Sequence, residues 1–100
     1  MKKLDINDIK RKITLICAGT PVSKMVLFGS FAKGTADLNS DIDLFMMSNG
    51  AITGFAFYDL KSQIEDAFDA DVDLIPDLDI IPYSKLERQI KEHGVVVYEK

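Results

Sequence analysis

The chain has 100 residues, the length of one domain with a single hydrophobic core. Hydrophobic residues make up 47% and charged residues 28%, a balance that is typical of globular domains and excludes wholesale disorder. The net charge of −4 argues against a protein that holds a nucleic-acid backbone by charge alone, because such binding needs a surplus of Lys and Arg.

The cysteine content and the hydrophobic runs indicate the compartment. Cys17 is the single cysteine and cannot form an internal disulfide, which favours a reducing environment. The apolar run after Lys10, Arg11 and Lys12 is too short for a signal core, and no stretch approaches the roughly eighteen apolar residues of a membrane span. We therefore expect a soluble, cytoplasmic protein with no membrane partner.

Hydrophobic spacing in the first half of the chain predicts one helix followed by two strands. Ile6, Ile9, Ile13 and Ile16 recur at three- and four-residue intervals, the pattern of an amphipathic helix. The apolar runs at 24–28 and 41–47 are typical of buried strands. Between these strands the sequence predicts a loop and a short helix.

The second half of the chain also alternates between predicted helices and strands. Phe57, Leu60, Ile64 and Phe68 predict a helix, residues 71–75 a strand stopped by Pro76, and the segment up to Pro82 an irregular crossing. Ser84 and Glu87 form a capping box for a last helix, which Gly94 ends before a final strand. This order predicts one domain over residues 1–100, with the α/β (α+β) fold of a small mixed sheet flanked by helices.

Aspartates interrupt two of the predicted strands. Twelve of the 16 acidic residues are Asp, a poor strand former. Side chains alternate across a strand, so Asp41 and Asp43 share one face with Cα atoms about 6.5 Å apart, where both could reach one divalent cation or bridge two. Such a pair is more often solvated on an edge strand, but Asp73 in the next strand would bring a third carboxylate if the strands are neighbours. Asp71 is the alternative for that third position.

Gly29 and Ser30 follow the first strand. Gly29 allows a sharp turn and a close approach to a ligand, and Ser30 could start a short helix whose free N–H groups hold phosphate oxygens. Alone the pair is typical of a plain turn, whereas with the three aspartates it predicts a site for a metal-bound polyphosphate. The same interpretation predicts that Gly29→Val blocks the phosphates without touching the acids.

These residues resemble a known family. Gly29-Ser30, ten intervening residues and Asp41-x-Asp43 resemble the signature of the DNA polymerase beta-type nucleotidyltransferase superfamily. The run GSFAKGTADLNSDIDL, with the later VDLI and IKEHGVVVYE, is similar to its minimal nucleotidyltransferase branch, which includes antitoxins paired with HEPN-type toxins.

The resemblance implies roles for individual residues. Asp41 and Asp43 would bind two Mg²⁺ ions, and Asp73 would bind one of them and help to deprotonate the acceptor hydroxyl. Gly29 and Ser30 would hold the β- and γ-phosphates of ATP. Lys33 stands in a segment where family members often carry Arg, and it would supply charge to a phosphate without the two-pronged geometry of Arg.

Two classes of function remain open at this stage. The first is an enzyme that moves a nucleoside monophosphate, AMP from ATP, onto a hydroxyl. Because the predicted core uses most of the chain, a partner protein or a second copy would complete the acceptor pocket. By resemblance, a tyrosine of a HEPN-type toxin is the preferred acceptor and a small-molecule antibiotic the alternative. The second class is a binding module that neutralises a partner by contact, and the complete set of three aspartates favours the enzyme.

Overall fold

A computed structural model describes residues 5–29 and 41–100. The elements are α1 (Ile6–Cys17), β1 (Lys24–Phe28), β2 (Ile42–Met47), α3 (Gly54–Phe68), β3 (Val72–Pro76), the 3₁₀ turn η1 (Asp77–Asp79), α4 (Lys85–His93) and β4 (Val95–Glu99). The predicted alternation of helices and strands is confirmed over these ranges. The short helix predicted between the first two strands lies outside them.

The strands in the described ranges form one mixed sheet with the order β3-β2-β1-β4. β1 pairs antiparallel with both β2 and β4, whereas β2 and β3 are parallel. Parallel neighbours need a crossover connection, which α3 supplies. The predicted α/β fold with a mixed sheet is therefore confirmed.

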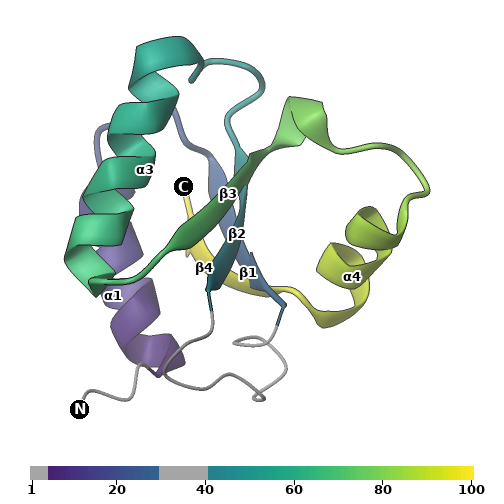
Figure 1. Cartoon of the computed structure of the whole chain (residues 1–100), viewed down its shortest axis with the longest axis horizontal. Helices are drawn as coiled ribbons and strands as arrows, with labels where there is room; N and C mark the ends of the chain where they lie inside the picture. The colour runs from purple at the N-terminus through teal and green to yellow at the C-terminus, as the bar shows by residue number, and fades with distance from the viewer. Residues whose placement is uncertain (1–4, 30–40) are drawn as a thin grey trace.

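Two layers of helix enclose the sheet. α1 and α3 cover one face and α4 the other (Figure 1). The main core lies under α1 and α3, where Ile13 and Ile64 meet the inward side chains Leu27 and Leu44 of the sheet. A smaller cluster of Val26, Phe28 and Phe45 lies on the opposite face and packs against α4 through Leu86 and Ile90. No helix in these parts of the chain is long and apolar enough to cross a membrane.

Element boundaries differ from the predictions in three places. β2 begins at Ile42, and α3 begins at Gly54, three residues before the first apolar position of its predicted stripe. Pro76, predicted to stop the third strand, is its last residue. Among the described strands, β3 lies at the edge of the sheet and pairs with β2 alone, so a residue without an N–H is tolerated there.

Side chains cap the starts of two helices. The Asp5 carboxylate accepts a hydrogen bond from the Asp8 N–H at 2.8 Å, which caps α1. At α4, the Ser84 hydroxyl accepts from the Glu87 N–H at 3.2 Å. The Glu87 carboxylate reaches back to the Tyr83 N–H at 3.1 Å, one residue before the position that a standard capping box would use.

Gly94, the residue directly after α4, lies where the packing leaves no room for a side chain. Its φ of −68° is open to any residue, but an added Cβ would collide with the Ile90 carbonyl and lie 2.6 Å from the Val26 Cγ1 atom. We expect Gly94→Ala to destabilise the protein by about 1–3 kcal/mol, the usual range for overpacking. Urea unfolding of the variant beside the wild type measures this cost, with no contribution from backbone strain because φ is negative. A free energy of unfolding equal to or above that of the wild type would contradict the close packing.

Candidate functional site

The predicted acidic residues lie at the amino-terminal ends of β2 and β3. Asp43 and Asp73 are partners in the parallel register, so their Cα atoms are separated by about one strand spacing of 4.8 Å. Asp41 and Asp71 each come two residues earlier, just before their strands begin. The Ile42 N–H donates to the Asp71 carbonyl at 3.0 Å. The predicted convergence of the aspartates requires their two strands to be neighbours, and β2 and β3 are neighbours in the sheet.

Asp43 and Asp73 point to the face of the sheet that α4 covers. In β2, Leu44 belongs to the main core and Phe45 to the smaller cluster, so alternation places Asp43 on the face of Phe45. In β3, Ile75 packs against that cluster and places Asp73 on the same face. Asp43 is partly buried and Asp73 is exposed. The pair therefore has one side against protein and one side open to a ligand.

Gly29 lies directly against the Asp43 side chain. Its φ is +74°, and a Cβ built on it would collide with the Asp43 Oδ2 atom and lie 3.0 Å from Cγ. Only glycine combines this left-handed backbone with such a close approach at little cost. The expectation that Gly29→Val leaves the acids untouched is wrong, because any side chain at this position meets the Asp43 carboxylate first.

The charges of the aspartates act on one another. Burial raises the pKa of the Asp43 carboxyl above its ordinary value, and the negative charges of Asp73 and then Asp41 raise it further. Asp71 is not among these causes. Within the acidic set, Asp43 is thus the central member and Asp73 its principal charged neighbour.

The donors suit a hard divalent cation. Carboxylate oxygens are the ligands that Mg²⁺ prefers, and a cation would offset the repulsion that Asp43 experiences from Asp73 and Asp41. Within residues 5–29 and 41–100, no three His, Cys, Asp or Glu side chains are gathered into a set that could hold a metal. Like charges repel, so carboxylates without a cation have a physical reason to stand apart. Metal binding by all three stays a prediction.

Two of the predicted phosphate-binding residues lie outside the described ranges. Ser30 and Lys33 fall within residues 30–40, and their roles stay predictions. The described residues that flank this segment, Gly29 and Asp41, lie at the end of the sheet that holds Asp43 and Asp73, because Phe28 pairs with Asp43 and Asp43 with Asp73. The contact between Gly29 and Asp43 was not predicted, because it depends on the antiparallel register that pairs Phe28 with Asp43 and no local pattern reports register.

The comparison with protein-family models identifies the family. The model described as polymerase beta, nucleotidyltransferase matches residues 7–100. The chain belongs to this nucleotidyltransferase family. The matched range contains every described element of the sheet and all four aspartates of its acidic end, so the resemblance in the sequence is confirmed over nearly the whole domain.

Individual relatives of this nucleotidyltransferase domain are named as protein adenylyltransferases or occur in toxin–antitoxin structures. The protein adenylyltransferase MntA of Shewanella oneidensis is 34% identical over 76 residues, which cover 75% of this chain and 52% of that protein. The chain thus spans about half the length of MntA. A crystal structure of a toxin–antitoxin with AMP-PNP matches with a TM-score of 0.77 at 26% identity, over 91% of this chain and 73% of that one.

A third similarity, at a lower sequence identity, shows the fold alone. A re-refined structure of a tri-AMPylated HEPN toxin of Shewanella oneidensis in complex with an MNT antitoxin matches with a TM-score of 0.71 at 21% identity. The match covers 95% of this chain and 73% of that chain. The mixed sheet and its flanking helices are therefore the shared architecture of nucleotidyltransferases in this group.

Proposed function

We propose that this domain transfers AMP from ATP onto a hydroxyl group of a partner protein. The observation that carries the proposal is the arrangement of Asp43, Asp73 and Gly29: two carboxylates in register, with a glycine backbone against one of them. A polyphosphate could approach this backbone closely, because Gly29 itself carries no side chain. The family and the name of the MntA relative support adenylyl transfer in particular.

In this proposal, Asp41, Asp43 and Asp73 would hold Mg²⁺. The cation would neutralise charge on the triphosphate and favour loss of pyrophosphate. Gly29, with Ser30 and Lys33, would position the β- and γ-phosphates so that the α-phosphorus faces the acceptor.

An aspartate of this chain would also accept the proton that the acceptor hydroxyl releases. The acceptor oxygen forms a bond to the α-phosphorus while the bond from that phosphorus to the bridging oxygen of pyrophosphate breaks. The hydroxyl proton passes to the Asp73 carboxylate, which is exposed and can face the acceptor. Asp43, held between Gly29 and Asp73, would keep the two reacting groups in line.

A tyrosine of a HEPN-type toxin is the proposed acceptor, which gives the domain the role of an antitoxin. The toxin–antitoxin structures among its relatives, one with AMP-PNP and one with an AMPylated HEPN toxin, support this choice. Asp73 lies at the open edge of the sheet, so a tyrosine carried by another protein could reach it. The site and its acceptor would then come from different chains.

A second candidate is a non-catalytic module that neutralises the same partner by contact. One observation favours it: the described carboxylates are not gathered into a set that could hold a metal. The two candidates make opposite predictions for label transfer, because contact alone leaves no AMP on the partner.

The experiment compares Asp73→Asn with Asp71→Asn. Purified protein is incubated with Mg²⁺, a HEPN-type toxin and ATP labelled on the α-phosphate or, separately, on the γ-phosphate. We expect label on the toxin from α-labelled ATP alone, and a loss of roughly a hundredfold or more in Asp73→Asn, as for removal of a catalytic acid–base group. Asp71→Asn should stay within about threefold of the wild-type rate, because surface changes away from reacting groups have small effects.

Each alternative outcome has a definite meaning. Transfer of γ-label would mean phosphoryl rather than adenylyl transfer. Tight binding of the toxin without any label would favour the contact module. A larger loss in Asp71→Asn than in Asp73→Asn would exchange the roles of these two acids.

A further inference from the structure

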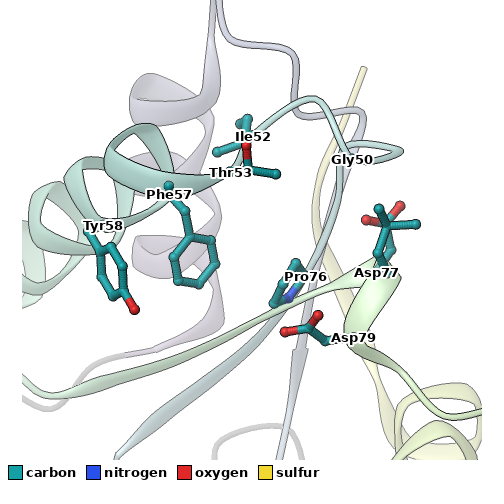
Figure 2. A pocket seen from close by; sticks show the side chains of 10 residues that line it. Gly50, Ile52, Thr53, Phe57, Tyr58, Pro76, Asp77 and Asp79 are labelled. Carbon is teal, nitrogen blue, oxygen red and sulfur yellow. The ribbon is translucent and has the colours of Figure 1, made fainter.

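A pocket lies at the end of the sheet opposite the acidic site. It has a volume of about 300 Å³ and lies between the start of α3, the turn after β2 and the turn η1 (Figure 2). Along β3, Asp73 and the pocket residue Pro76 are three residues apart, or about 10 Å at the rise of a strand. The pocket is therefore separate from the proposed site of nucleotide transfer.

One side of this pocket is apolar and aromatic. α3 contributes Phe57 and Tyr58, whose side chains lie across from Pro76 (Figure 2). Leu78 adds to the wall and is 68% exposed, while Tyr58 is 66% exposed. Phe55, three residues before Tyr58 on α3, is 95% exposed. Side chains of this size exposed together around a hollow indicate a surface that another molecule covers.

The other side of the pocket is acidic. Asp77 and Asp79 line it, and no Lys, Arg or His is among the described lining residues. The Asp77 Oδ2 atom accepts from the Asn49 N–H at 2.9 Å, but its Oδ1 atom is shielded from solvent without a hydrogen-bond partner in the described structure. Among the described residues, the ion pairs include neither Asp77 nor Asp79. Within the described structure, the negative charge of this wall is therefore not offset by a nearby cation.

We propose that this pocket binds an arginine side chain of a partner protein. A guanidinium group stacks on aromatic rings and pairs with carboxylates, and its three-carbon stem suits the apolar wall. A protein is the source we favour because Phe55 lies beside the pocket without lining it. A small cation inside would leave Phe55 uncovered, whereas a partner surface around an anchoring arginine would cover it. This inference needs neither nucleotide nor metal, so it stands apart from the proposed transfer reaction.

The test uses peptides without nucleotide. A short peptide with blocked ends and one arginine between leucines is titrated into the protein, and amide chemical shifts are followed by NMR. The matched peptide carries citrulline, which keeps the shape of arginine without its charge. We expect the arginine peptide to bind about tenfold more tightly, the scale on which one hydrogen bond to a charged group contributes. The shifts should gather at Gly50, Gly54 and Leu78 rather than at Gly29.

Two variants and a small cation show whether the binding depends on the pocket and on a partner protein. Asp79→Asn should remove the difference between the two peptides, while Asp66→Asn, the same change at an exposed position of α3 outside the pocket, should keep it. Equal binding of both peptides, or equal effects of the two variants, would overturn the proposal. Agmatine, the amine that carries the same guanidinium, should bind more weakly than the peptide. If agmatine bound as tightly, the pocket would be a small-cation site and a partner's side chain would be the wrong occupant.

Discussion

Asp43→Asn is expected to abolish adenylyl transfer while leaving the metal-free protein at least as stable as the wild type. Asn keeps the shape of the side chain, so its contact with Gly29 should remain. The substitution removes the carboxylate that Asp73 and Asp41 repel. Activity should fall roughly a hundredfold or more, the scale on which enzymes lose rate when a reacting or charge-stabilising group is removed.

The stability effect should depend on pH in a defined direction. The pKa of Asp43 is raised in the folded protein, first by burial and then by its acidic neighbours. The folded chain therefore holds this proton more tightly than the unfolded chain does, and the wild type loses stability as pH rises through the unfolded pKa of about 3.9 and then the folded one. The Asn variant lacks this loss. Its melting temperature should match that of the wild type near the acidic end and exceed it by a few degrees at neutral pH.

Thermal melts across this pH range in EDTA measure the effect, with Asp66→Asn as a control for net charge. A second series in excess Mg²⁺ tests the metal. A ligand at a hundred times its dissociation constant stabilises a protein by about 2.7 kcal/mol, so Mg²⁺ should raise the melting temperature of the wild type and act much less on Asp43→Asn. If Asn instead cost several kcal/mol without metal, Asp43 would be a structural hydrogen-bonding partner and the metal site would have to be abandoned.

Gly29→Ala is expected to damage both stability and activity. At a φ of +74° a non-glycine residue costs about 1–2 kcal/mol from backbone strain alone. The new Cβ also meets the Asp43 carboxylate, which must turn away from the position that the proposed reaction requires. We expect a loss of roughly a hundredfold in transfer rate, since small misplacements of reacting groups have effects of this size.

Two comparisons separate the backbone strain in Gly29→Ala from the collision of its Cβ with the Asp43 carboxylate. Gly19 has a φ of +78° with nothing within 4 Å of an added Cβ, so Gly19→Ala measures the backbone cost alone by urea unfolding. The extra cost of Gly29→Ala should largely disappear when Asp43 is also changed to Ala, because the double variant removes the atoms in conflict. Equal costs at Gly19 and Gly29, or no change in the double variant, would mean that the glycine and the carboxylate do not interact.

Much of the fold could be predicted from the sequence because its signals are local. The isoleucine stripe of α1 and the apolar runs of β1 and β2 report which side of each element is buried, and this requires only the periods of helix and strand. The cap at Asp5 depends on residues three apart. The aspartates were conspicuous for the same reason, since a charge inside an apolar run conflicts with its surroundings.

The features that the sequence left open depend on contacts between segments that are far apart in the chain. The sequence predicted Asp73, with Asp71 as the alternative, but the pairing of Asp73 with Asp43 comes from the parallel register of β2 and β3, which a crossover through α3 establishes. The restriction on Gly29 arises from Asp43, 14 residues away in sequence, and that on Gly94 arises in part from Val26, 68 residues away. The pocket lined by Phe57 and Asp77 exists because α3 and η1 meet at the carboxyl ends of β2 and β3. Local composition thus determined the elements and the residues able to react, whereas strand register and close packing decided which of those residues meet, because both depend on contacts between segments far apart in the chain.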